Sequence, residues 1–287
     1  MKIGKHEIGN GNAVFIIAEV GINHNGDVNI AKKLIAAANK AGCHAVKLQK
    51  RTIDVVYTQQ ELATPRDNPF GTTNGDLKRG LELSLEDYKE IDRYCKEQDI
   101  LWFASPWDEA SVDFLEQFDV PCHKIAAASL TDAGLLKKIK ETGKPVLLST
   151  GMSDIGEIDK AVEILGKDRL LLMHCVSQYP AAPENIHLRG MLTLKERYDL
   201  PIGYSGHELD TVISPAAVAM GALLVERHFT LDRTMWGSDH KASIEPAEME
   251  ALVEAIKLVE QALGSETVQC LPVEAPVRDK LRRVNSI

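Results

Sequence analysis

Short apolar segments alternate with longer amphipathic segments along the chain. Eight of the apolar segments predict buried strands, residues 14–19, 44–49, 100–105, 122–126, 145–150, 170–175, 202–205 and 223–226. Each segment is four to six residues long and mostly apolar, which is typical of strands covered on both faces of a parallel sheet.

A candidate helix follows each apolar segment. The helix over residues 31–40 is expected to end at Gly42, which suits a helix cap. Another helix is expected to begin at Ser84, where Asp87 completes a sequence resembling a capping box. Further helices are expected over residues 215–220 and 246–263. Eight strand–helix pairs in 287 residues predict a (β/α)₈ TIM barrel, an α/β fold with a single domain over residues 1–287.

The pattern leaves one rival fold and one irregular region. The rival is an open doubly wound sheet, and its dinucleotide-binding form is disfavoured because no GxGxxG follows a strand. Residues 51–82 contain Pro65, Pro69 and a TTNG turn, and we expect a long irregular loop there. A loop of that length inside a compact domain is usually functional or mobile.

The charge balance narrows the class of partner. The net charge is −9 without any basic block, which argues against a nucleic-acid or anionic-membrane partner but allows a local basic pocket. The chain shows neither the apolar core of a signal peptide nor a run of transmembrane length, so we expect a cytoplasmic protein. Its five widely spaced cysteines indicate neither a disulfide framework nor a CxxC metal site.

Polar side chains stand at the ends of the predicted strands, where the active site of a TIM barrel lies. They are Glu19, Lys47, Gln49, Ser105, Lys124, Ser149, Ser177, Tyr179, His207 and His228. Lys47 and Lys124 interrupt apolar strands, and a buried lysine needs an anionic partner. That partner is either Glu19 or another acid in a structural salt bridge, or the phosphate or carboxylate of a substrate that the serines also bind.

Two histidines are candidates for a metal site. Residues 201–231 form a strand, a helix and a strand, and His207 and His228 follow the two strands. Strands joined by one helix are neighbours in a parallel sheet, so both imidazoles are expected on the same face. Such a pair leaves coordination positions open for water, a carboxylate or a substrate on a labile ion such as Mn²⁺ or Mg²⁺.

Other residues near this pair have simpler interpretations. Three further histidines are expected to be core residues hydrogen-bonded to backbone, namely His44, His123 and His174. Glu226 and Glu208 lie near the metal candidates in sequence, and Glu226 points to the same side as His228. Glu226 is therefore either a carboxylate that supports the metal ligands without binding the ion itself, or the ion-pair partner of Arg227 or Arg233.

Motifs at seven of the eight predicted strands, with one more after the last strand, carry a resemblance to a known family. They are AEVGINHNG (18–26), VKLQ (46–49), FASPWD (103–108), LSTGM (148–152), HCVSQYP (174–180), GYSGHE (203–208), ERHFT (226–230) and SDH (238–240). In this order they resemble the sialic acid synthase family, whose members condense phosphoenolpyruvate with N-acetylmannosamine or a related amino sugar to make a nonulosonic acid.

The resemblance implies roles for individual residues. His207 and His228 match the family's metal ligands, usually for Mn²⁺, with Mg²⁺ or Co²⁺ as alternatives, and Glu19 matches a proposed acid/base beside the metal. Phosphoenolpyruvate-binding positions correspond to Lys47, Ser105, Lys124, Ser149 and Ser205, and Ser177 stands where some members have asparagine. Sugar-contacting positions correspond to Gln49, Tyr179 and Asp239. A homodimer is also implied.

The chain departs from the family pattern in two places. Ala127 stands where many members have a phosphate-contacting serine, for which Ser129 is a candidate substitute. Typical members continue into an antifreeze-like domain that supplies an arginine to the N-acetyl group, whereas this sequence stops after the barrel. A separate antifreeze-like protein is therefore a possible partner, or residues 68–75 cap the sugar instead.

Two alternatives to the synthase stay open. A metal-dependent pyruvate aldolase or lyase acting on a sugar acid would not need the lysine and serine set that suits a phosphate. A non-catalytic barrel subunit that requires a partner belongs to a different class. Against it, the chemical positions named above are intact except for the serine at position 127.

Overall fold

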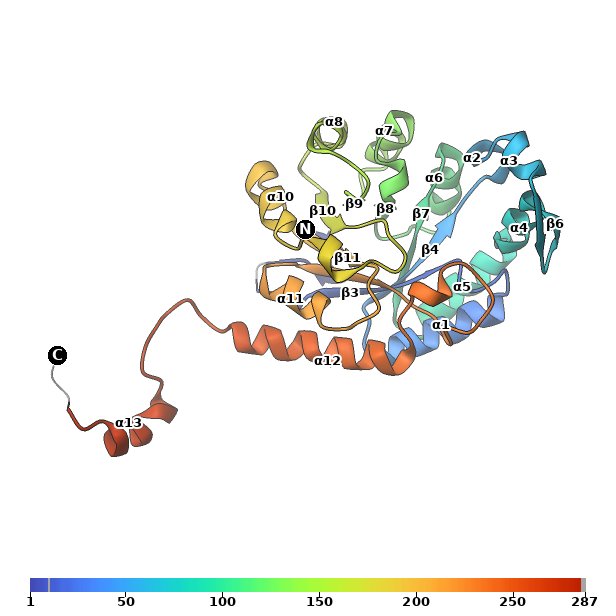
Figure 1. The fold of residues 1–287 in the computed structure, drawn as a ribbon. Helices are drawn as coiled ribbons and strands as arrows, with labels where there is room; N and C mark the ends of the chain where they lie inside the picture. Colours follow the sequence, from blue (N-terminus) through green and yellow to red (C-terminus); the bar gives the residue numbers. More distant parts are fainter. Residues whose placement is uncertain (10, 285–287) are drawn as a thin grey trace.

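The computed structural model describes residues 1–9 and 11–284, and within them eight parallel strands form a barrel (Figure 1). In chain order the strands are β3 (Phe15–Gly21), β4 (Ala45–Lys50), β7 (Leu101–Pro106), β8 (His123–Ile125), β9 (Val146–Ser149), β10 (Leu170–Cys175), β11 (Ile202–Gly206) and β12 (Leu224–His228). Each strand pairs in parallel with the next barrel strand along the chain except β7 with β8, which lie side by side, and β12 pairs with β3. The predicted (β/α)₈ barrel is confirmed.

One main helix follows each barrel strand and covers its outer face. These helices are α1 (Val28–Ala41), α5 (Leu85–Glu97), α6 (Glu109–Glu116), α7 (Ala133–Glu141), α8 (Ile155–Leu165), α10 (Gly190–Tyr198), α11 (Ile213–Ala219) and α12 (Pro246–Leu263). The short α9 (Pro183–Ile186) precedes α10. Both predicted caps are present, because Gly42 takes a φ of 89° after α1 and Ser84 forms a capping box with Asp87 at the start of α5.

The segment between β4 and α5 is structured, so the expectation of an irregular loop over residues 51–82 was wrong. It contains α2 (Ile53–Val56), α3 (Gln59–Ala63), the antiparallel hairpin of β5 (Pro65–Asn68) and β6 (Gly71–Thr73), and α4 (Asn74–Leu81). Capping boxes begin α3 at Thr58 and α4 at Thr73. Elements of three to eight residues are too short to produce a clear hydrophobic period, which is why the pattern did not predict them.

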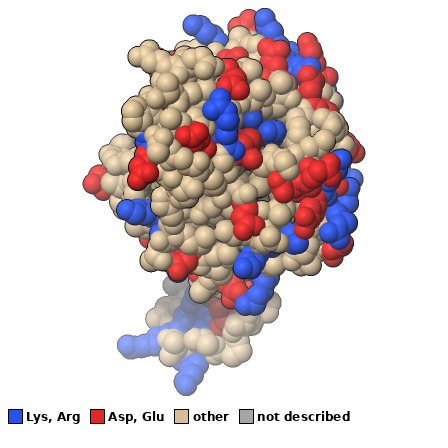
Figure 2. Space-filling model, turned by 90° about the vertical axis from the view of Figure 1, so that its right-hand side faces the viewer, with Lys and Arg blue, Asp and Glu red and all other residues tan. Residues whose placement is uncertain are grey.

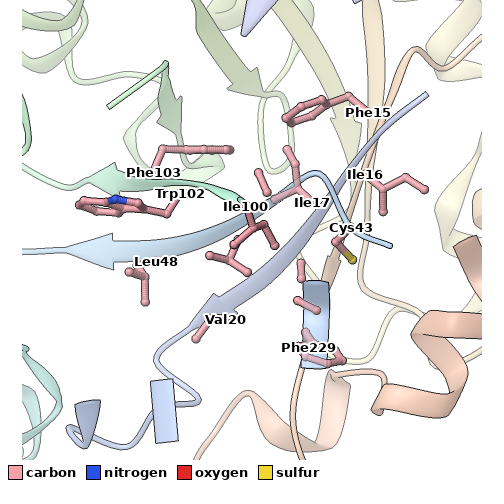
Figure 3. Packing of buried hydrophobic residues seen from close by; sticks show 14 of the residues in the cluster. Phe15, Ile16, Ile17, Val20, Cys43, Leu48, Ile100, Trp102, Phe103 and Phe229 are labelled. Atoms are coloured by element: carbon pink, nitrogen blue, oxygen red, sulfur yellow. The ribbon is translucent and has the colours of Figure 1, made fainter. Parts of the chain in front are cut away.

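The barrel interior consists of an apolar layer below a polar one. Side chains two residues apart point to the same face of a strand, so Ile17 lies one layer below Glu19 and Phe103 one layer below Ser105. Both apolar side chains are fully buried. Figure 3 shows part of the buried apolar core. Trp102 lies next to Phe103 on β7, and Leu48 lies on β4. The packed layer forms the floor of the cavity above it.

Two segments flank the barrel, one before β3 and one after α12. A hairpin of β1 (Lys2–Ile3) and β2 (His6–Glu7) covers the amino-terminal end of the barrel, where Ile3 is fully buried. After α12 the chain leaves the barrel, and η3 (Pro272–Glu274) and α13 (Ala275–Leu281) are exposed (Figure 1). No helix in the described residues has the length and apolarity needed to cross a membrane. Figure 2 shows acidic and basic side chains interspersed on one face.

Candidate active site

The carboxyl ends of the strands surround a cavity of about 360 Å³, a size that suits small-molecule substrates. All of the residues predicted for the site line it, namely Glu19, Lys47, Gln49, Ser105, Lys124, Ser149, Ser177, Tyr179, Ser205, His207, His228 and Asp239. The structure thus brings the whole predicted set together, while the role of each residue stays a prediction.

Two buried lysines face one buried carboxylate deep in this cavity. Oε1 of Glu226 lies 3.4 Å from Nζ of Lys47 and 3.5 Å from Nζ of Lys124. Lys47 also forms an ion pair with Glu19 at 3.1 Å. The expected salt bridges of the two lysines therefore exist, and the same lysines line the cavity. The two interpretations of these lysines are compatible.

Serine hydroxyls complete the surroundings of these charges. Lys47 Nζ donates to Ser105 Oγ at 3.2 Å, and Lys124 Nζ donates to Ser149 Oγ at 2.7 Å. Ser205 Oγ donates to Oε1 of Glu226 at 3.1 Å. Each hydroxyl keeps further donor or acceptor capacity for a ligand in the cavity.

The buried charges shift one another's protonation equilibria. Burial alone would lower the pKa of Lys47, but the carboxylates of Glu19 and Glu226 outweigh it and raise that pKa. Burial lowers the pKa of Lys124. The charge of Lys47 lowers this pKa further, whereas the carboxylate of Glu226 raises it. Burial would raise the pKa of Glu226, yet the two lysines bring it to about 2. Glu226 is therefore a carboxylate whose charge depends on its lysine partners.

The ion-pair partners expected for Glu226 were wrong. Arg227 is buried on the opposite face of β12 and forms its ion pair with Glu208 at 3.1 Å, whereas Arg233 forms one with Glu248. Strand alternation explains this, because adjacent residues point to opposite faces. The same alternation correctly predicted that Glu226 shares a face with His228. It did not predict that Lys47 and Lys124, from other strands, lie next to Glu226 on that face.

Glu19 occupies an irregular point in the sheet. The pairing of β3 with β4 shifts between Glu19 and Gly21, as in a β-bulge. Gln49 Nε2 donates to Glu19 Oε1 at 3.0 Å. Gly21 has a φ of 54°, and a Cβ at that position would lie 3.1 Å from Glu19 Oε1. A glycine is required here because it allows this backbone and leaves room for the carboxylate.

The two histidines predicted as metal ligands lie side by side in the cavity, at the ends of the neighbouring strands β11 and β12. Their ring centroids are 5.3 Å apart, and Tyr179 packs its ring 4.2 Å from that of His207. His207 Nδ1 donates to the Val176 carbonyl at 2.7 Å, which leaves Nε2 with its lone pair available. Burial and the neighbouring His228 lower the pKa of His207 to about 3, so its ring is neutral at physiological pH.

These donors fit a divalent ion in an open site. Nδ1 of His228 is buried without a hydrogen-bond partner, as expected of a nitrogen available for another ligand. Across residues 1–9 and 11–284, no group of three or more His, Cys, Asp or Glu residues is arranged to hold a metal ion. Two imidazoles would therefore need water or substrate to complete the coordination, which suits an exchangeable ion rather than a structural one.

The mouth of the cavity contains residues that the sequence did not single out. Arg51, Lys78, Tyr57 and Trp107 all line it. Arg51 follows Lys47 and Gln49 at intervals of two along β4, so alternation extended past the strand would have found it. The position of Lys78 depends on how α4 packs beside the barrel, and the sequence has no local signal for that.

Several expectations near the site need correction. Ser129 lies outside this cavity and lines a neighbouring one, so it does not replace a serine at position 127. Glu208 follows His207 in the chain, and its buried carboxylate pairs with Arg227 and accepts a hydrogen bond from Tyr204. None of residues 68–75 lines the cavity, which argues against their capping the sugar directly.

The core histidines mostly behave as expected. His174 bonds to the backbone carbonyl of Ile186, and His44 accepts a hydrogen bond from the backbone amide of Ile16. His123 instead bonds to the carboxylate of Glu116. The expectation of a backbone partner was therefore wrong for His123.

Comparison with known proteins relates the chain to a family of sugar-acid synthases. The sequence profile of the NeuB family matches residues 34–268. Human N-acetylneuraminate-9-phosphate synthase is 39% identical over 279 residues, 96% of this chain and 78% of that protein. N,N'-diacetyllegionaminic acid synthase of Legionella pneumophila is 37% identical over 279 residues, 94% of this chain and 78% of that protein.

A solved structure extends the likeness to the fold. The N-acetylneuraminic acid synthetase of Leptospira borgpetersenii, crystallised with citrate, superimposes with a TM-score of 0.87 at 32% identity, covering 99% of this chain and 98% of that one. The chain belongs to the NeuB family and is an enzyme of the sialic acid synthase type.

Proposed function

We propose that this enzyme condenses phosphoenolpyruvate with the open-chain aldehyde of an amino sugar and water, releasing a nonulosonic acid and inorganic phosphate. The observation that supports this most is the arrangement of two lysines around Glu226 in the same cavity as the His207–His228 pair. One end suits an anionic enol phosphate and the other suits an aldehyde that needs polarisation. N-acetylmannosamine or a related amino sugar is the proposed acceptor.

Lys47 and Lys124 would bind phosphoenolpyruvate together with the nearby serines. Glu226 holds the two ammonium groups close to each other, and Ser105 and Ser149 supply hydroxyls at the same depth. Ser177 and Ser205 line the same cavity and would contribute further hydrogen bonds. Positioned cations stabilise the negative charge that develops on the departing phosphate.

His207 and His228 would hold a divalent ion, with Mn²⁺ as the first candidate and Mg²⁺ or Co²⁺ as alternatives. When bound, such an ion acts as a Lewis acid toward the aldehyde oxygen. The hydrogen bond from His207 to Val176 fixes the orientation of its ring. The sugar chain would then extend past Gln49, Tyr179 and Asp239 toward the mouth of the cavity.

Glu19 is the proposed general acid/base. Bond formation joins C3 of phosphoenolpyruvate to C1 of the aldehyde and leaves positive charge at C2, which one water molecule then captures. The carboxylate of Glu19 takes the proton released by that water and passes it to the former aldehyde oxygen, which becomes a hydroxyl. The C2 hydroxyl then gives its proton to the phosphate as the C2–O bond to phosphate breaks and C2 becomes a ketone. Glu19 is suitably placed because it is buried, hydrogen-bonded by Gln49 and paired with His228 across the β3–β12 ladder.

Acceptor-dependent phosphate release tests the proposal. We expect phosphate release from phosphoenolpyruvate with an amino sugar, loss of release after chelation, and strong loss in Glu19→Gln. Ser129→Ala is the matched control, because Ser129 lies outside the cavity. Turnover of a nonulosonic acid to pyruvate and sugar, without phosphoenolpyruvate chemistry, would favour a lyase instead. The homodimer and a separate antifreeze-like protein stay predictions that the chain alone does not test.

A further inference from the structure

A second cavity lies behind the barrel wall, between β10 and the helices α8 and α10. Its volume is about 470 Å³, which suits a small molecule. Strand alternation explains its place, because His174 and Val176 point away from the barrel interior and toward the helices. Arg197 of α10 donates twice to Asp159 of α8, through Nε at 3.0 Å and Nη2 at 2.6 Å. This contact sets the spacing of the two helices that enclose the cavity.

The lining of the second cavity is uncharged. Apolar side chains from α8 and α10 form one side, namely Ile155, Ile158 and Leu194. The polar side chains are those of Thr150, Ser153, His174, Ser177 and Thr193. Among the described residues, no lysine, arginine, aspartate or glutamate lines it. An anion such as phosphoenolpyruvate or a sugar acid would lie there without a counter-charge, so the cavity favours an uncharged ligand.

His174 offers one hydrogen-bond acceptor to this cavity. Its Nε2 donates to the Ile186 carbonyl at 2.7 Å, and since a carbonyl only accepts, the proton is on Nε2. Burial lowers the pKa of His174, so the ring is neutral at physiological pH and Nδ1 keeps its lone pair. Within the part of the chain that the structure describes, Nδ1 has no hydrogen-bond partner. Gly190 leaves room for the ring, because a Cβ there would lie 3.3 Å from Nδ1.

The hydroxyl groups of the second cavity offer little more. Thr150 and Ser153 each donate to a backbone carbonyl at 3.2 Å. The hydroxyls of Ser177 and Thr193 have no partner among the described residues. A ligand therefore meets few free polar groups beside a broad apolar face. A flat ring with one polar atom matches this lining, whereas a sugar would leave several of its hydroxyls unsatisfied.

The second cavity shares a wall with the active-site cavity. Met152, Cys175 and Ser177 line both. The wall is closely packed, since a Cβ on Gly151 would lie 2.6 Å from Ser177 Oγ and 2.8 Å from Cys175 Sγ. Met152 takes a φ of 57°, a left-handed backbone conformation that is strained for methionine. A ligand that displaces this wall would move Ser177, which is proposed to bind phosphoenolpyruvate.

We propose that the second cavity binds an uncharged aromatic heterocycle with a ring N–H, and that this binding lowers the affinity for phosphoenolpyruvate. The ring N–H donates to Nδ1 of His174, and the ring faces pack against the apolar side chains of α8 and α10. The coupling to phosphoenolpyruvate rests on the proposed function, whereas the binding of the heterocycle does not.

Calorimetric titration with three ring compounds tests the binding. Indole has one ring N–H, 1-methylindole has none, and indole-3-acetate carries a negative charge. We expect indole to bind, and each of the other two to bind about 10-fold more weakly or worse, because one lacks the donor for His174 and the other buries an unpaired charge. His174→Phe keeps a ring but removes the acceptor, and it should reduce the affinity for indole to that for 1-methylindole.

Two adjacent residues of α10 provide a matched pair of variants. Thr193 lines the second cavity, so Thr193→Trp should fill it and abolish indole binding. Leu192 is exposed and does not line it, so Leu192→Trp adds the same side chain and should preserve indole binding. Thr193 is exposed as well, and both variants should fold, as circular dichroism would show.

Steady-state kinetics measure the coupling. Saturating indole should raise KM for phosphoenolpyruvate by about 5-fold or more in the wild type and in Leu192→Trp, but not in Thr193→Trp. No indole binding at millimolar concentration, or binding that Thr193→Trp leaves unchanged, would overturn the site. Binding with an unchanged KM would overturn the coupling. Indole binding in an enzyme that turns over no acceptor would contradict the proposed function and leave the site intact.

Discussion

The carboxylate of Glu226 lies 3.5 Å from the ammonium of Lys124 in the interior of the barrel. The same oxygen lies 3.4 Å from Lys47 Nζ, so one acceptor holds two like charges together. Without it, the two buried ammonium groups would repel each other with little water to screen them. This relationship connects strands β4, β8 and β12 and organises the deep end of the site.

Replacement of Glu226 by glutamine, which has nearly the same shape, should therefore weaken substrate binding strongly. We expect Glu226→Gln to reduce kcat/KM for phosphoenolpyruvate by about 100-fold or more, because both lysines lose their shared counter-charge. Ser205→Ala removes the hydrogen bond to Glu226 and the one proposed to phosphoenolpyruvate, leaves all three charges in place, and should cost about 10-fold. A smaller loss of kcat/KM in Glu226→Gln than in Ser205→Ala, measured by steady-state kinetics, would contradict the role of Glu226.

The histidine pair predicts direct metal binding. Calorimetric titration of metal-free wild-type enzyme with Mn²⁺ should show one site, and His207→Ala and His228→Ala should each abolish it. His174→Gln serves as the control, since His174 bonds to the Ile186 carbonyl and does not line the active-site cavity. Unchanged Mn²⁺ binding in both alanine variants would disprove this assignment independently of any activity.

Stability should depend on pH through His24. This side chain is buried, its Nδ1 accepts from the Gly26 amide, and burial together with Arg51 lowers its pKa to about 4. A folded-state pKa below the unfolded value of 6.5 means that the stabilisation is present above pH 6.5 and lost as pH falls toward 4. Between pH 7.5 and 5.5 the group should cost roughly 1 kcal/mol of unfolding free energy.

Urea denaturation of His24→Gln measures this contribution. Glutamine does not titrate, so the difference in unfolding free energy between wild type and variant should shrink on going from pH 7.5 to 5.5. Other titrating groups are common to both proteins and cancel to first order. A constant difference over this range would show that His24 does not titrate as described.

The ion pair of Arg227 and Glu208 should stabilise the loop that contains His207. Arg227 Nη1 also donates to the Asp210 carbonyl at 3.0 Å, and Tyr204 donates to Glu208 at 2.8 Å. Arg227→Met leaves a buried carboxylate unpaired and should cost about 3–5 kcal/mol. The double variant Arg227→Met/Glu208→Leu removes both charges and should be the more stable of the two in chemical denaturation. Equal stabilities would argue against a coupled pair.

The sequence was informative where local pattern determines structure. Strand positions, the caps at Gly42 and Ser84 and the cavity-facing residues all follow from hydrophobic runs and alternation. The bounds of α12 were also as predicted. Motif resemblance then added Ser205 and Asp239, and the place of Asp239 in the cavity depends on a loop.

What the sequence missed depends on tertiary packing. Glu226 reaches Lys47 and Lys124 because the closed barrel brings β4, β8 and β12 together. Nothing in the local sequence favours these lysines over Arg227 as the ion-pair partner of Glu226. Lys78 reaches the cavity because the hairpin and short helices after β4 place α4 beside it. Both cases are long-range contacts without a periodic signal.

The fate of the phosphate oxygen tests the central claim most directly. The reaction is run in ¹⁸O-enriched water with phosphoenolpyruvate and the preferred acceptor, and the released phosphate is analysed by mass spectrometry. Breakage of the C2–O bond predicts acceptor-dependent phosphate that contains no oxygen from the water. Phosphate with one solvent-derived oxygen, or release that does not require an acceptor, would contradict the account.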